Sequence, residues 1–410
     1  MCATQPLPTD VPAAARPTVR LRPKAEARAI RHGFPWVYAD ELVLDRRTKA
    51  LMPGTLARLE DAERRPLGTV AVTPASRIPA RVLDPDPEAE IGPDWIKQRI
   101  TRALALRARL YPDPFYRLIH AEGDGLPGVV IDRFGDAAVL QPNAAWADAR
   151  CDLLVEALRD VVGVRTVVLN GQGRARAAEG LPEETRCLVG EVRGPVAVPM
   201  NGATYWADLL GGQKTGLYFD QRDNHAFAAA LVPEGGRVLD VFSHVGGFGL
   251  ASLAAGAGSA LLVDGSEPAL ALAQRGADAM GLADRLTTRR EDAFKALEHL
   301  AVEGEVFDAV ICDPPAFAPA KSALEAGLRA YERVARLAAP LVAPGGVLTL
   351  CSCSHAADLT RFRTASVRGI GRGGRRAQLV RTGFAGADHP MLPQLAETGY
   401  LKALTFRLDG

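Results

Sequence analysis

The second half of the chain alternates short apolar runs with helical stretches, and this alternation constrains the fold more than any other feature. After about residue 201 the runs are RVLDVF, ALLVDG, RLTTRRE, FDAVICD and GVLTLCS. Mostly apolar strands separated by helices form a parallel sheet that is covered on both faces. In such a doubly wound α/β sheet, ligands bind at the carboxyl ends of the strands, so we expect the chemistry there.

The first of these strands ends in Asp240 and leads through Ser243 to Gly246, Gly247 and Phe248, where a helix opens. Glycines let the backbone approach a ligand closely, and a helix N-terminus offers N–H groups to an anion. The spacing is not the G-x-G-x-x-G of dinucleotide-binding proteins, which disfavours NAD. Such a turn is also common for purely structural reasons, so the loop alone leaves both interpretations open.

Two further acids follow the next strands. Asp264 ends ALLVD, where a carboxylate can accept hydrogen bonds from both ribose hydroxyls of either NAD or S-adenosylmethionine. Asp292 follows the third strand, in position to contact an adenine amino group. It is also a good N-cap for the helix AFKALEHL, and both roles can hold together.

The segment Asp313-Pro314-Pro315 ends the fourth strand and is followed by Phe317. Two prolines make a rigid loop with a polar acceptor fixed at its start. Such a loop can bind the edge of a planar base, with Phe317 near enough to stack on it. A plain structural turn is the alternative.

The fifth strand runs into Cys351 and Cys353. Carbon 5 of a pyrimidine is a poor nucleophile, but a thiolate that adds to carbon 6 activates it. Cys353, at the strand tip beside Asp313, could supply that thiolate, whereas a buried structural cysteine fits Cys351 better. The six cysteines form neither an evident disulfide framework nor a zinc-site spacing, so we expect no metal.

The first half of the chain has a different organisation. Residues 1–16 are rich in Pro, Ala and Thr and look like a disordered lead-in, and 17–90 contain short strands broken by Pro and Gly, typical of a small β-barrel. Residues 91–200 open with a basic amphipathic helix and continue as a smaller α+β domain. We assign 201–410 to the α/β domain.

The net charge of +1 conceals an uneven distribution. Residues 16–81 hold 14 Lys and Arg against 7 Asp and Glu, 201–360 hold 12 against 19, and 361–381 hold seven arginines and no acid. This pattern suits a polyanion held by the basic segments, although a solvated surface is the alternative. Without a long apolar run or a secretory signal, we expect no membrane partner and a cytoplasmic protein.

Taken together, these features resemble bacterial large-subunit (23S) ribosomal RNA cytosine-5 methyltransferases that carry an N-terminal PUA domain. The resemblance covers nearly the whole chain from about residue 17. The segments that resemble the family are His32–Trp36, EGDGLPG at 122–128, Gln213–Asp223, DVFSHVGGF, CDPPAF, SCS, Ala387–Pro390 and Tyr400–Lys402.

The resemblance implies a PUA barrel, a central α+β domain and a Rossmann-like class I methyltransferase domain, with S-adenosylmethionine as cofactor and large-subunit rRNA as partner. Cys353 falls on the family nucleophile, with Asp313 beside it. The expected cofactor contacts are Asp240, Ser243, Gly246, Gly247, Phe248, Asp264, Asp292, Asp313, Tyr218, Gln221 and Arg222. Asp220 joins the site candidates. Expected RNA contacts are Lys214, Pro314, Pro315, Phe317, Lys24 and Arg28. The sequence leaves the oligomeric state open, with a homodimer as one alternative.

Some positions depart from the family pattern. His244-Val245 replaces Tyr-Thr, and Phe34 replaces a histidine on the PUA surface. Ala316 stands where another RNA cytosine methyltransferase family has a second cysteine, so the base that removes the carbon-5 proton is not identified. The Gly- and Arg-rich stretch 368–376 looks looser than the helix expected there.

The sequence leaves other functions open. A similar fold could methylate a guanine or adenine nitrogen without a thiol, or carbon 5 of uracil with the same thiol. A non-catalytic RNA-binding factor would use the PUA-like segment alone, and a Rossmann oxidoreductase would need the dinucleotide glycine pattern that is missing here.

Overall fold

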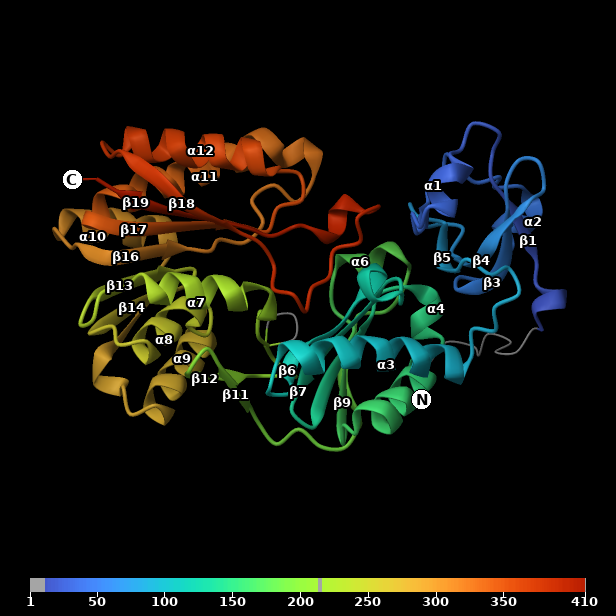
Figure 1. Ribbon diagram of the computed structural model, residues 1–410, viewed down its shortest axis with the longest axis horizontal. Helices are drawn as coiled ribbons and strands as arrows, with labels where there is room; N and C mark the ends of the chain where they lie inside the picture. Colours follow the sequence, from blue (N-terminus) through green and yellow to red (C-terminus); the bar gives the residue numbers. More distant parts are fainter. Residues whose placement is uncertain (1–11, 213–215, 410) are drawn as a thin grey trace. The chain divides into compact units, whose positions relative to one another are not determined.

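The computed structural model describes residues 12–212 and 216–409 (Figure 1). The chain divides into two compact units. The first comprises Met1–Arg193 with Ala387–Thr398, and the second comprises Gly194–Gly386 with Gly399–Gly410. A short segment near the C-terminus therefore belongs to the first unit, which the sequence patterns did not indicate.

A five-stranded sheet begins the first unit, in the order β1-β3-β4-β5-β2. Its edges are joined beyond β1 and β2, where Arg22 N–H donates to Glu41 O at 2.7 Å and Val43 N–H donates to Arg20 O at 2.9 Å. The predicted small β-barrel is therefore confirmed. Its elements are β1 (Thr18–Arg20), α1 (Ala27–Arg31), β2 (Trp36–Val37), α2 (Arg46–Lys49), β3 (Thr55–Glu60), β4 (Pro66–Val72) and β5 (Ala80–Asp84).

The last residues of the expected disordered lead-in are held in place. Ala13–Ala15 form a short 3-10 helix. The buried Arg16 side chain donates to Ala89 O at 2.7 Å and to Glu90 Oε2 at 3.1 Å. Residues 12–16 are therefore ordered, although they belong to the segment expected to be disordered. Residues 1–11 lie outside the described residues.

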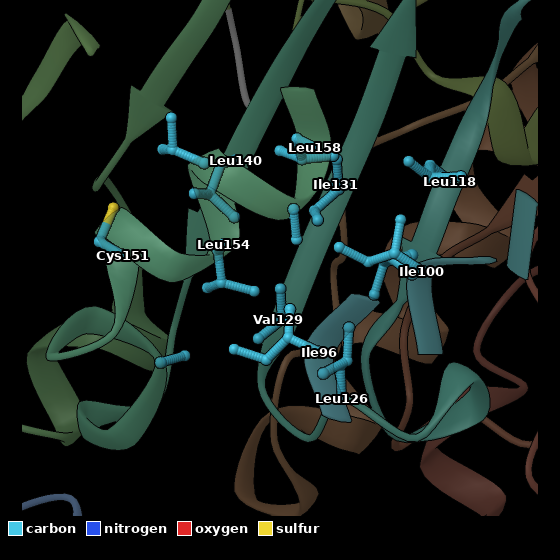
Figure 2. Close-up of a cluster of buried hydrophobic side chains, with 14 of the residues drawn as sticks. Ile96, Ile100, Leu118, Leu126, Val129, Ile131, Leu140, Cys151, Leu154 and Leu158 are labelled. Carbon is cyan, nitrogen blue, oxygen red and sulfur yellow. The ribbon is translucent and has the colours of Figure 1, made fainter. Parts of the chain in front are cut away.

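The rest of the first unit is a five-stranded sheet in the order β10-β9-β8-β7-β6, covered by α3 and α5. Ile96 and Ile100 of α3 pack on Leu118 and Ile131 of the sheet, because apolar residues four apart share one face of a helix (Figure 2). The elements are α3 (Pro93–Leu110), β6 (Phe115–His120), β7 (Val129–Phe134), β8 (Ala137–Pro142), α4 (Ala145–Asp148), α5 (Cys151–Ala157), β9 (Thr166–Asn170), α6 (Arg174–Ala178) and β10 (Thr185–Val189).

A buried arginine attaches the C-terminal segment 387–398 to this domain. Arg107 is completely buried and forms two hydrogen bonds with the Asp124 carboxylate, each 2.7 Å long. It also donates to the carbonyl of Asp388 at 2.8 Å, and the Asp388 carboxylate accepts from Arg117 N–H at 2.9 Å. The guanidinium is thus satisfied by partners from two distant parts of the chain.

The second unit contains the hairpin of β11 (Val196–Met200) and β12 (Ala203–Ala207) and a seven-stranded sheet in the order β15-β14-β13-β16-β17-β19-β18. The first five strands are parallel, as predicted, and β19 runs antiparallel to both of its neighbours. The strands are β13 (Arg237–Val241), β14 (Ser259–Asp264), β15 (Leu286–Arg290), β16 (Phe307–Cys312), β17 (Val342–Ser352), β18 (Ala377–Gly383) and β19 (Lys402–Leu408).

Helices cover this sheet. One core combines the strands with α10, α11 and α12, while α7, α8 and α9 group together elsewhere on the sheet (Figure 1). The helices are α7 (Arg222–Ala230), α8 (Gly247–Ala254), α9 (Glu267–Ala279), α10 (Ala293–Val302), α11 (Leu324–Ala338) and α12 (Leu359–Arg372). Every helix within the described ranges is too short or too polar to cross a membrane.

The Gly- and Arg-rich stretch around 368–376 differs from expectation, because α12 continues through most of it to Arg372. Gly369 explains the glycine content: a Cβ added there would lie 2.6 Å from Ala335 Cβ on α11 and would also meet the Glu332 carbonyl. The missing side chain therefore lets two helices pack closely and does not loosen the chain.

Candidate active site

The strand order brings four of the predicted residues to one edge of the sheet. Asp264, Asp240, Asp313 and Cys353 lie at or just beyond the carboxyl ends of β14, β13, β16 and β17, which are consecutive neighbours. Asp313 N–H donates to Val241 O at 3.2 Å, which ties the Asp-Pro-Pro loop to the end of β13.

Asp240 is buried, and one of its carboxylate oxygens accepts Gly249 N–H at 2.9 Å. Its other oxygen, Oδ1, and the buried hydroxyl of Ser243 have no hydrogen-bond partner among the described residues. Burial raises the pKa of Asp240 to about 7. Buried polar atoms without partners are uncommon in folded proteins, so this pair fits a ligand that supplies hydrogen-bond donors.

The glycines of the loop have different roles. Gly246 adopts a left-handed conformation, with φ of 82°, as the N-cap of α8. A Cβ on Gly247 would lie 2.6 Å from His225 Nε2, so this glycine is required by the packing of α8 on α7. Phe248 packs on the same histidine, with ring centroids 4.4 Å apart. Backbone conformation and helix packing therefore account for these glycines, and the expected close approach of a ligand stays a prediction.

Asp264 and Asp292 both bind backbone N–H groups. The Asp264 carboxylate accepts from His244 N–H at 2.9 Å and from Ser266 N–H at 2.8 Å, and so fixes the loop after β13. Asp292 is the N-cap of α10 and accepts Lys295 N–H at 3.1 Å. The capping role considered for Asp292 is present, and a role toward adenine stays a prediction.

The segment before α7 lies at the same site. Tyr400 donates to Asp220 Oδ2 at 2.5 Å, and the buried Gln221 accepts from Asn224 at 2.7 Å. Burial raises the pKa of the Tyr218 phenol, as do the negative charges of Asp220, Asp313 and Cys353. Tyr218 therefore lies among the predicted site residues. Arg222 places its guanidinium 5.6 Å from the Phe219 ring centre. Lys214 lies outside the described residues.

The Asp-Pro-Pro loop differs in part from what the sequence suggested. Pro314 is buried and Pro315 exposed. The Phe317 ring packs in an aromatic cluster, 5.0 Å from Tyr331, 6.1 Å from Phe294 and 6.3 Å from Phe242. In this position Phe317 supports the loop from the core side, and stacking on a base would require it to leave the cluster.

Cys353 is half-buried, whereas Cys351 is buried within β17. Tyr331 holds both chain neighbours of Cys353. Ser352 Oγ donates to the phenol oxygen at 2.9 Å, and Ser354 Oγ lies 2.7 Å from the same oxygen. Ala318 N–H, from the loop after β16, donates to Ser354 Oγ at 2.9 Å. The loop that carries Asp313 and the loop that carries Cys353 thus share one hydrogen-bonded network.

The sequence patterns did not indicate this network. Tyr331 lies in the middle of an amphipathic helix, where a buried aromatic residue has no distinctive signal.

Lys24 and Arg28, the basic residues expected to contact RNA, are exposed in the first unit. In the described part of the chain, no group of three or more His, Cys, Asp or Glu side chains is arranged to hold a metal ion.

Two family models match the chain. A PUA-like domain matches residues 19–85, and an S-adenosylmethionine-dependent methyltransferase matches residues 164–407. Among curated proteins, "Ribosomal RNA large subunit methyltransferase I" of Aeromonas hydrophila is 34% identical over 94% of this chain and 98% of its own length. The protein of that name from Photobacterium profundum is 36% identical over 92% of this chain and 96% of its own.

Solved structures agree on the fold. A chain from Streptococcus mutans, described as a SAM-dependent methyltransferase, matches with a TM-score of 0.80 over 95% of this chain and 100% of that chain, at 18% identity. The structure of SMU.776, described as a methyltransferase complexed with SAH, matches with a TM-score of 0.80 over 95% of this chain and 99% of that chain, also at 18% identity.

Proposed function

The chain belongs to the family of S-adenosylmethionine-dependent methyltransferases that carry an N-terminal PUA-like domain, and we propose that it methylates carbon 5 of a cytosine in large-subunit (23S) ribosomal RNA. The observation that carries the proposal is the position of Cys353. It lies just beyond β17, next to the strand that leads to Asp313, and two strands from the buried carboxylate of Asp240. The names of the curated relatives support ribosomal RNA as the substrate.

The buried polar atoms at the end of β13 would hold the cofactor. Asp240 Oδ1 and Ser243 Oγ offer two acceptors in a site screened from water, and the Gly246–Gly247 turn opens α8 beside them. S-adenosylmethionine supplies the methyl group. Burial raises the pKa of Asp240, which means that its ionised form is poorly stabilised in the ligand-free protein. A cationic or N–H donor of the cofactor would stabilise that ionised form.

Cys353 would activate the base. Its thiolate adds to carbon 6 of the cytosine, and carbon 5 becomes nucleophilic enough to accept a methyl group. A base then removes the proton from carbon 5, and the bond from sulfur to carbon 6 breaks to restore the ring and the thiolate. Asp313, at the start of the rigid Pro-Pro loop, would bind the edge of the base.

Nucleoside mass spectrometry of 23S rRNA tests the proposal. RNA from a strain lacking the gene should gain one 5-methylcytosine after incubation with the protein and S-adenosylmethionine. The Cys353→Ala variant should lose this activity while it still binds the cofactor in calorimetry. Full activity in that variant would contradict the thiol mechanism, and methylation of a guanine or adenine nitrogen would then be indicated by the product.

The identity of the methylated nucleoside also distinguishes the target base. A 5-methyluridine product would replace cytosine by uracil as the target but keep the role of Cys353. Failure to bind S-adenosylmethionine would favour a non-catalytic RNA-binding factor. We further propose that the protein acts in the cytoplasm and forms a homodimer. Sedimentation of the purified chain tests the homodimer.

A further inference from the structure

Lys402 is a buried cation with an unusual set of partners. Lys402 is the first residue of β19, and it is only 5% exposed. The ammonium group donates to the carbonyl oxygens of Ser354 at 2.7 Å and Ala357 at 2.9 Å. Both partners are neutral, and no described carboxylate forms an ion pair with it. A buried charge usually has an opposite charge nearby, because burial without one is costly.

The position of Lys402 relates it to Cys353. In the antiparallel pair of β17 and β19, Lys402 lies opposite Ser352, the residue before Cys353. Its ammonium binds the carbonyl of Ser354, the residue after Cys353. Lys402 therefore contacts the backbone on one side of the cysteine and pairs with the strand on the other.

The charges around Lys402 come from several elements. Burial lowers the pKa of its ammonium to about 8, whereas a thiolate at Cys353 and the carboxylate of Asp358 would act in the opposite direction. Asp358 is exposed and caps α12, where it accepts Arg361 N–H at 2.9 Å. Tyr331 of α11 is also close enough for a negative charge at Cys353 to raise the pKa of its phenol. Cys353 is thus one of the two groups whose negative charge would favour the charged form of the buried ammonium, and the exposed Asp358 is the other.

We propose that Lys402 is a positioning residue that stabilises the thiolate form of Cys353. The inference deepens the proposed function, on whose nucleophilic cysteine it rests. The carboxylate of Asp313, which follows the neighbouring strand β16, would repel such a thiolate. Below about pH 8, where Lys402 is charged, its ammonium offsets that repulsion and, through the Ser354 carbonyl, also fixes the backbone that carries the sulfur. No acid or base has to move for this effect.

Alkylation of Cys353 by iodoacetamide tests this without RNA or cofactor. The full-length protein is treated between about pH 6 and about pH 10, and peptide mass spectrometry measures the modification rate of Cys353 at each pH. In Lys402→Gln the amide can still donate to a carbonyl but carries no charge, and Lys402→Met provides a second neutral variant. Both should shift the midpoint of the rate profile upward by about one pH unit or more.

The control variant is Arg329→Met, which removes one positive charge from an exposed position on α11. Its profile should coincide with that of the wild type, and Lys402→Arg, which keeps a cation, should lie closer to the wild type than either neutral variant. A neutral variant that binds S-adenosylmethionine normally but keeps the wild-type midpoint would overturn the inference. Because the readout is independent of methylation, an active Cys353→Ala protein would reject the proposed function and leave this result standing.

Discussion

The phenol oxygen of Tyr331 lies 2.7 Å from Ser354 Oγ, so that a helix behind the sheet holds the loop of the candidate nucleophile. The same oxygen accepts from Ser352, the residue on the other side of Cys353. The position of the sulfur therefore depends on the hydroxyl of a buried tyrosine.

Tyr331→Phe should lower kcat for RNA methylation by about tenfold, because two buried serine hydroxyls lose their common partner. Binding of S-adenosylmethionine should not change. The matched control is Thr349→Val, which removes a buried hydroxyl that bonds Thr405 at 3.0 Å between β17 and β19. Both variants should lose about 1–3 kcal/mol of unfolding free energy. Equal kcat values for the two would contradict a role in positioning Cys353.

Asp240 should make cofactor binding and stability depend on pH in opposite directions. Because burial raises its pKa to about 7, the unfolded chain releases this proton at lower pH than the native protein. Its contribution to the stability of the ligand-free protein is present in acid and is lost as pH rises through about 7. The affinity for S-adenosylmethionine should instead rise over this range. Calorimetry and thermal unfolding of Asp240→Asn should show both dependences reduced, and unchanged profiles would argue against this assignment.

Gly369→Ala should destabilise the second unit by about 1–3 kcal/mol, because the new methyl group would push α12 away from α11. Gly371 lies in the same helix, but a Cβ there would meet nothing within 4 Å. Gly371→Ala should therefore be neutral or stabilise the protein by up to about 1 kcal/mol. Urea unfolding of the two variants compares them directly, and similar losses in both would show that helix packing is not the cause.

Arg107→Met should cost about 3–5 kcal/mol, because the buried Asp124 carboxylate would lose its counter-charge. Arg165, whose ion pair with Asp136 is exposed, provides the control. Arg165→Met should change the unfolding free energy by less than about 1 kcal/mol. Proteolysis near 387–398 should also become faster in Arg107→Met alone. Resistance equal to that of the wild type would mean that other contacts hold this segment.

The parallel sheet was predictable from the sequence because most of its strands are apolar runs, and the ends of four of these strands locate candidate site residues. Asp240, Asp264, Asp313 and Cys353 follow from that rule alone. Strand β18 was not predictable, since Ala377–Gly383 is largely exposed and lacks an apolar pattern. The role of Tyr331 also requires coordinates, because its partners lie about twenty residues away along the chain, in β17 and the loop after it.

The hydrogen bond between Arg107 and Asp388 limits when the first unit can finish folding during synthesis. Asp388 lies 281 residues after Arg107 in the chain, yet its carbonyl completes the hydrogen bonds of that buried guanidinium. A ribosome that has synthesised the whole first unit up to Arg193 has not yet supplied residues 387–398. The first unit therefore reaches its final form only after residues 387–398 have been synthesised, and a product without them would leave the buried Arg107 guanidinium with one hydrogen-bond partner fewer.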